Sequence, residues 1–293
     1  MKKDDSLGLI LILGIIAIAL FGGAKNSQNF FGTGQSQNQN NQQNIERQIQ
    51  DTQIKVDDLK KQIQEEEDKK TRSKYYNQVQ IQYINRSDNP SYEYVAIKFN
   101  DSATTTIDVT GWQLKSLSSG SSVTIPKGTQ LFFANTPNYE EDIVLIPGDL
   151  VYLVTGVSPN GSSFRVNKCS GYLSQFQTFI PYLSTNCPAP RNEDLSSIPK
   201  IKVNYDCLDY IQYFPSCRIQ TTSLPINWSY ECTDFIYKKI NYPSCVDAHK
   251  NEKDFYQKEW RVYLKRSESV WEYRRENVVL YDNQGKVVSS IQY

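Results

Sequence analysis

IDVTGWQLKS, residues 107–116, is the segment on which the fold prediction rests. Apolar and polar residues alternate along it, which is typical of a β-strand with one buried face. Asp108 is suited to turning the backbone ahead of the strand, and Gly111 permits a close approach that a Cβ atom would block. We expect Trp112 to be the largest single burial in the domain. These three residues are therefore predicted to serve the fold rather than catalysis.

The strand pattern extends to both sides of this segment. YEYVAIKFN precedes it at residues 92–100, and further apolar stretches follow at residues 129–134, 142–146 and 150–154. Turn-forming runs such as Pro126-Lys127-Gly128 separate these stretches. Short strands spaced about 10–15 residues apart predict an antiparallel β-sandwich or barrel.

The strand motifs resemble those of the lamin tail domain, a family of immunoglobulin-like β-sandwiches. That family has a Glu-aromatic-Val-x-Ile strand, a strand with Asp and Gly-Trp, and an Ile-Pro-x-Gly turn. In this chain the three motifs occur at residues 93–97, 107–114 and 125–128. Residues 145–156 match a further strand, and NVVLYDNQGKVVSSIQY, residues 277–293, resembles the closing hairpin. Phe99 is one residue more than the family pattern has, which suggests a bulge or a longer first hairpin.

The resemblance implies one mainly β, immunoglobulin-like antiparallel sandwich that is split by an insertion. Residues 75–165 would form its first part and residues 256–293 its closing strands, around a cysteine-rich, partly helical insertion at 166–255. The predicted structural core consists of Tyr94, Val95, Ile97, Asp108, Gly111, Trp112, Leu114, Trp260, Leu280 and Tyr293.

The insertion contains all six cysteines: Cys169, Cys187, Cys207, Cys217, Cys232 and Cys245. An even number of cysteines in a short segment behind a membrane-targeting segment predicts a disulfide framework. An approximate repeat, Cys-x-Asp to Pro-Ser-Cys, occurs twice, each time as a short helix stopped by Pro215 or Pro243. The repeat favours Cys207–Cys217 and Cys232–Cys245, which leaves Cys169–Cys187, although many other connectivities are possible.

The N-terminal region predicts a membrane anchor. Residues 7–23, LGLILILGIIAIALFGG, contain no charge and reach the length needed to span a bilayer. Lys2 and Lys3 precede them, so we expect a single-pass anchor at 1–24 with a cytoplasmic N-terminus and an extracytoplasmic C-terminal domain. The alternative is a cleaved signal peptide, for which the cleavage site is poor.

Residues 25–44 form a Gln/Asn-rich stretch that predicts a flexible linker. Apolar residues then recur at alternating spacings of four and three, at Ile45, Ile49, Val56, Leu59 and Ile63, with Thr52 in the same seam. This heptad pattern predicts a coiled-coil helix over 45–74, and a possible homo-oligomer through 45–63. The alternative is a single solvated helix that spaces the domain from the membrane.

The composition disfavours catalysis and nucleic-acid binding. Lys plus Arg and Asp plus Glu both number 32, so the chain has no general basic field. The chain has one histidine and no Gly-x-Ser-x-Gly, phosphate-loop or His-Glu-x-x-His motif. His249, without ligand spacing around it, is expected to be a surface residue rather than a metal ligand. We therefore assign no catalytic residue, no metal and no cofactor.

We expect a bacterial, membrane-anchored, non-catalytic envelope or surface protein. The resemblance implies that its lamin-tail-like domain binds or tethers an unidentified envelope protein or polysaccharide outside the cytoplasm. One alternative is an accessory or substrate-binding subunit of an envelope hydrolase. Another is a nucleic-acid-binding module, whose only local support, Lys265-Arg266 and Arg274-Arg275, is interleaved with glutamates.

Overall fold

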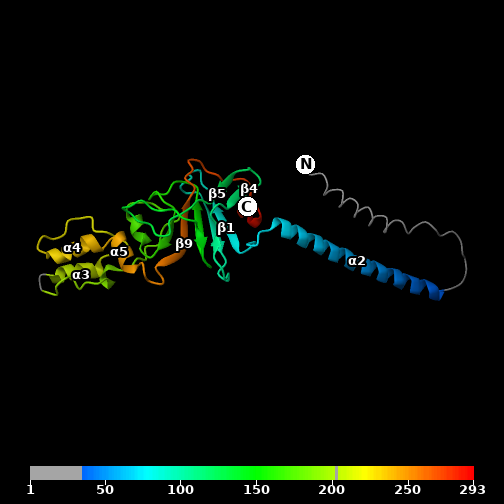
Figure 1. Cartoon of the computed structure of the whole chain (residues 1–293), viewed down its shortest axis with the longest axis horizontal. Helices are drawn as coiled ribbons and strands as arrows, with labels where there is room; N and C mark the ends of the chain where they lie inside the picture. The colour runs from blue at the N-terminus through cyan, green and yellow to red at the C-terminus, as the bar shows by residue number, and fades with distance from the viewer. Residues whose placement is uncertain (1–34, 202–203) are drawn as a thin grey trace. The chain divides into compact units, whose positions relative to one another are not determined.

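A computed structural model describes residues 35–201 and 204–293 of the chain (Figure 1). The predicted anchor at 1–24 lies outside the described residues, as does the first part of the linker. Among the described helices, none combines the length and the apolar character that a bilayer crossing needs. The chain divides into two compact units, of which the second covers Glu65–Tyr293.

Helix α2 (Gln35–Thr71) begins inside the segment predicted to be a flexible linker and ends close to the predicted boundary at residue 74. Glutamine has a good helix propensity, so a Gln-rich stretch can extend a helix that is already formed next to it. The helix is therefore confirmed, and it is longer than predicted. The pairing of its apolar seam with another helix stays a prediction.

The second unit contains two main sheets and one short pair of strands. The first sheet has the order β1 (Val79–Asn85), β2 (Tyr94–Phe99), β7 (Leu150–Val154), β9 (Tyr256–Tyr263) and β8 (Phe164–Asn167). The second has the order β11 (Val287–Gln292), β10 (Asn277–Tyr281), β4 (Gln113–Ser116) and β5 (Ser122–Thr124). The short pair joins β3 (Ile107–Asp108) to β6 (Val144–Leu145).

The strand directions correct one part of the fold prediction. All pairs between the named strands are antiparallel except β7 with β9, which run parallel with Val151 opposite Trp260. Parallel neighbours need a long crossover connection. The cysteine-rich insertion lies between these two strands in the sequence and supplies that connection. The first sheet is therefore mixed, and the prediction of a fully antiparallel sandwich is wrong at this position.

Side chains of both main sheets share one buried core. Six of the predicted core residues are at most 1% exposed there: Val95, Ile97, Trp112, Leu114, Trp260 and Leu280. Tyr293 packs against this core and remains partly exposed, whereas the partly exposed Tyr94 packs against a second core in the insertion. Burial alternates along β4 as the pattern predicts, whereas β2, β9 and β10 each bury at least three consecutive residues.

Two predicted core residues have local backbone roles instead. Asp108 is exposed, and its Oδ1 accepts a hydrogen bond from the Thr110 N–H at 2.9 Å, which forms the expected turn. Gly111 has a φ of +81°, and an added Cβ would lie 2.9 Å from Oδ1 of Asn283. Phe99 itself pairs in regular register with Val79, and the register of these two strands shifts further along, between Ile81 and Tyr83.

The described residues of the insertion include the short helices η1 (Ser170–Gln175), η2 (Pro190–Asn192), α3 (Tyr205–Tyr213), α4 (Tyr230–Lys239) and α5 (Tyr242–His249). Figure 1 shows α3, α4 and α5 grouped together beside the sheet that contains β9. Their buried residues form the second core, which also includes Val154, Phe164 and Tyr263 from the first sheet. The insertion is thus packed onto the sheet rather than attached through a free linker.

Candidate functional site

The disulfides determine the architecture of the insertion. All six cysteines are paired, as predicted, and the bonds are Cys169–Cys245, Cys187–Cys217 and Cys207–Cys232. The predicted connectivity, Cys207–Cys217, Cys232–Cys245 and Cys169–Cys187, is wrong in all three pairs. The reason is tertiary: Cys207 lies on α3 and Cys232 on α4, and the two helices pack against each other, so the repeats are joined to each other.

Pro243 also acts differently from the prediction. It was expected to stop a helix, but α4 has already ended at Lys239, and Pro243 lies in the first turn of α5. Proline is favoured there because the first helical N–H groups have no intrahelical partner. Asn241 caps the same turn by accepting a hydrogen bond from the Ser244 N–H at 3.0 Å. Cys245 is thereby placed on α5, within reach of Cys169 beside η1.

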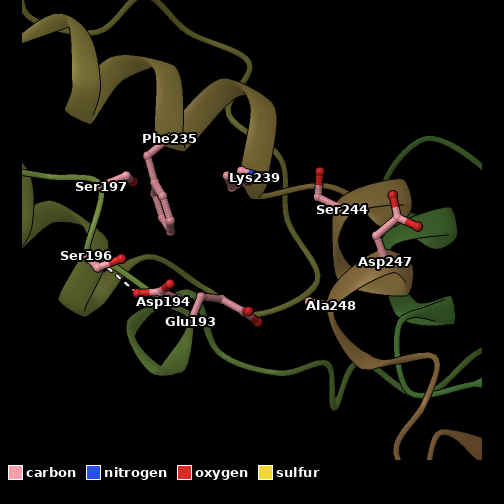
Figure 2. Close-up of a pocket in the computed structure, with 9 residues that line it drawn as sticks. All are labelled: Glu193, Asp194, Ser196, Ser197, Phe235, Lys239, Ser244, Asp247 and Ala248. Atoms are coloured by element: carbon pink, nitrogen blue, oxygen red, sulfur yellow. Dashed lines mark hydrogen bonds between the residues drawn. The ribbon is translucent and has the colours of Figure 1, made fainter.

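A pocket of about 460 Å³ lies between the η2 loop, α4 and α5 (Figure 2). Figure 2 shows Phe235 pointing from α4 toward the loop that carries Glu193 and Asp194. The carboxylates that line this pocket already have partners within the protein. Oδ1 of Asp194 accepts from the Ser196 N–H at 2.9 Å, and hydrogen bonding to Ser196 lowers the pKa of Asp194. Asp247 pairs with Lys250 at 2.9 Å. These charges therefore stabilise the local structure.

His249 joins this loop to the end of α5. Its Nε2 lies 3.0 Å from Oε1 of Glu193, and its Nδ1 lies 2.7 Å from Oε1 of Glu252. Glu252 is also bonded to Lys168, which pairs with Asp254 at 2.9 Å. The imidazole is partly buried, with 17% of its side chain exposed, so it is less exposed than expected. Within residues 35–201 and 204–293, no group of three His, Cys, Asp or Glu side chains is arranged to hold a metal ion.

The pKa of His249 is raised in the folded protein. Burial opposes the charged form, but the hydrogen bonds and charges of Glu193 and Glu252 outweigh burial. A raised folded-state pKa stabilises the fold fully below the unfolded value of about 6.5, and the stabilisation is lost as the pH rises through the folded pKa. We therefore expect the melting temperature to fall by a few degrees between pH 6 and pH 9.

This pH dependence can be assigned because His249 is the only histidine in the chain. In His249→Gln, the decrease in melting temperature between pH 6 and pH 9 should be much smaller. Thermal unfolding followed by circular dichroism at several pH values measures both proteins. An equally steep decrease in the variant would assign the effect to another group.

An aromatic groove of about 690 Å³ lies beside α3 in the insertion. The Tyr210 ring lines the groove, with centroid distances of 5.4 Å to Phe214 and 5.2 Å to Trp228. Tyr213 lines the same groove and is 81% exposed. Exposed apolar patches of this kind often mark binding surfaces. Nothing in the sequence analysis identified this groove, because its residues come together only in the folded insertion.

Three charged side chains lie at the aromatic groove, one of them, Asp206, in the first turn of α3. Asp206, Asp209 and Arg218 line it, and none has a hydrogen-bond or ion-pair partner among the residues that the structure describes. The groove therefore combines ring faces with polar groups that remain available for a partner. That combination is typical of the anchor regions of protein interfaces.

Comparison with models of known protein families gives no match for this chain, and a search of curated protein sequences gives none either.

Proposed function

We propose that this chain is a non-catalytic, membrane-anchored envelope or surface protein that presents a lamin-tail-like binding or tethering domain outside the cytoplasm. The observation that carries the proposal is the set of three disulfides in the insertion. Structural disulfides form and persist in oxidising compartments and are rare in the cytosol. An anchor at residues 1–24 with the C-terminal domain outside would place the insertion in such a compartment.

The lamin-tail assignment is supported by the positions of the motif residues. Trp112 lies in the core shared by the two main sheets, and Gly111 takes the positive φ that the Gly-Trp motif favours. The segment resembling the closing hairpin forms β10 and β11, and β10 pairs with β4 directly after the Gly-Trp pair. An immunoglobulin-like sandwich with one parallel strand pair would place its motif residues in this way.

Two surfaces support a role in binding. The aromatic groove of the insertion suits an envelope protein or a polysaccharide. The apolar seam of α2 is exposed in the single chain, with Ile49 63% and Leu59 54% exposed, which suits a second copy of the chain. A binding module raised from the membrane on a helix would use the two surfaces for ligand and self-association respectively.

The proposal is tested by a thiol-reactive polymer gel shift on washed membranes, with and without prior reduction. We expect the protein to pellet with the membranes and to shift only after reduction, because all six cysteines are paired. A matched chain lacking residues 1–24 should leave the pellet. A shift without reduction would show free thiols and would contradict the extracytoplasmic location.

A further inference from the structure

The pocket of Figure 2 is bounded on one side by residues 191–197 of the insertion, a short segment that we call the strap. Helices α4 and α5 supply the opposite wall. Ala189 before the strap and Ile198 after it are buried, at 9% and 2% exposed, so both ends of the strap are fixed. Four residues between these ends line the pocket: Glu193, Asp194, Ser196 and Ser197.

The strap has one polar contact with the rest of the protein. Oε1 of Glu193 lies 3.0 Å from Nε2 of His249, at the end of α5. Among the residues that the structure describes, every other hydrogen bond of the strap has its partner within residues 189–198. Leu195 adds a partly buried apolar contact with the second core. The attachment of the strap to α5 therefore depends on a single pair of side chains.

The surroundings of His249 require a doubly protonated ring. Nε2 faces Glu193, and Nδ1 lies 2.7 Å from Oε1 of Glu252. A carboxylate only accepts hydrogen bonds, so both ring nitrogens have to donate, whereas a neutral imidazole has one N–H. Glu252 stays ionised, since hydrogen bonding to Lys168 lowers its pKa. Both contacts are therefore satisfied only while the ring carries its positive charge.

No other group replaces this charge at the ring. Lys168 pairs with Glu252 and Asp254, and Burial raises the pKa of Tyr172 to about 12, so that phenol is neutral. In the described part of the chain, the polar contacts of the ring come from Glu193 and Glu252 alone. The elements packed against α5, and α5 itself, carry these further ionisable groups: Lys168 after β8, Asp254 after α5, Asp247 and Lys250 on α5, Lys239 on α4 and Tyr172 on η1.

Loss of one proton from the ring breaks one of the two contacts. The neutral ring keeps the shorter one, because the Glu252 N–H also donates to the His249 carbonyl at 2.9 Å and fixes this pair in one turn. Nε2 then presents a lone pair to the carboxylate of Glu193, which is unfavourable. We propose that residues 191–197 act as a pH-sensitive strap, which the His249 imidazolium holds against α5 and which is released, opening the pocket, when the ring becomes neutral.

Hydrogen exchange of the full chain in detergent, followed by mass spectrometry at pH 6 and pH 9, tests the proposal. The N–H groups of Asn192, Glu193 and Ile198 are hydrogen-bonded in the attached strap, so their exchange reports its release. After correction for intrinsic exchange, we expect the rate in peptides covering 189–198 to rise at least about fivefold, as suits the loss of one charge-assisted hydrogen bond. The turn at 158–162 has no titratable side chain and should not change.

Two variants separate release of the strap from a general loss of stability. His249→Gln has no ring proton to lose, so the corrected exchange of the strap should be equal at both pH values. Glu193→Gln keeps the pair of His249 with Glu252, and its amide can donate to a neutral ring or accept from a charged one. The pH dependence of the strap should then fall below about twofold, while the melting temperature still depends on pH through Glu252. General destabilisation would instead raise exchange in the turn at 158–162 as well.

Two results would overturn the proposal. One is equal corrected exchange of the strap at pH 6 and pH 9 in the unaltered protein. The other is a pH-dependent increase in Glu193→Gln as large as in the unaltered protein, because pH would then act on the strap through another group. Neither result bears on the membrane location, which the thiol gel shift tests separately.

Discussion

Trp112→Ala is expected to lower the free energy of unfolding by about 3–5 kcal/mol, the usual loss for a buried aromatic side chain. The indole is 1% exposed in the core shared by both main sheets, and its ring lies 5.5 Å from that of Tyr75. The change leaves a cavity that neighbours on two sheets cannot easily fill. Since domains are stable by only about 5–15 kcal/mol, the melting temperature should fall by about 10 °C or more.

Thermal unfolding of the full chain by circular dichroism measures this effect. Tyr139→Ala is the matched control, because Tyr139 is 83% exposed and its truncation should change stability by less than about 0.5 kcal/mol. Equal melting temperatures for Trp112→Ala and the wild type would show that Trp112 does not lie in the main core.

The strand faces could be predicted because alternation is a local property of the sequence. Val95 and Ile97 point inward from β2, and Leu114 from β4, as their spacing requires. The hairpin between β10 and β11 was also predictable, since its turn residues lie next to each other in the chain. For these segments, the residues that determine the structure are neighbours in the sequence.

The mixed first sheet could not be predicted in the same way. The parallel pairing of β7 with β9 depends on where the chain returns after the long insertion, and no local pattern records that position. The buried ion pair between Arg165 and Asp149, whose charged atoms lie 3.0 Å apart, could not be predicted for the same reason. Asp149 directly precedes β7 and Arg165 lies within β8, and only the folded protein brings the two charges together.

The candidate sites likewise combine features that a local sequence pattern reveals with features that depend on the folded chain. Sequence reasoning located the cysteine-rich insertion but assigned its pairs within each repeat, where loops are short. One pocket of the second unit combines Asn89, Thr178 and Tyr263 from three segments that are far apart in the sequence, and each of them alone is an ordinary polar residue. The unpaired Tyr263 hydroxyl becomes visible only when burial and hydrogen bonding are known together.

The second large effect is expected from removal of the Cys169–Cys245 disulfide, which joins residues 76 apart in sequence. A longer loop restricts the unfolded chain more strongly, so Cys169→Ser with Cys245→Ser should cost about 4 kcal/mol of stability. Removing Cys207–Cys232, which joins residues 25 apart, should cost about 1 kcal/mol less. Urea unfolding of both double variants measures the difference, and serine keeps the side-chain size nearly constant in each. Equal losses would show that strain or packing, rather than loop closure, determines the contribution of these bonds.

The same disulfides allow a direct test of connectivity. In Cys207→Ser, unfolded in urea without reductant, the one cysteine open to alkylation should be Cys232, because the other two bonds remain closed. Peptide mapping identifies the labelled residue. Labelling of Cys217 instead would show that Cys207 pairs with Cys217, as the repeat in the sequence predicts. The helices α3 and α4 would then have no covalent link, and the aromatic groove beside α3 would depend on packing alone.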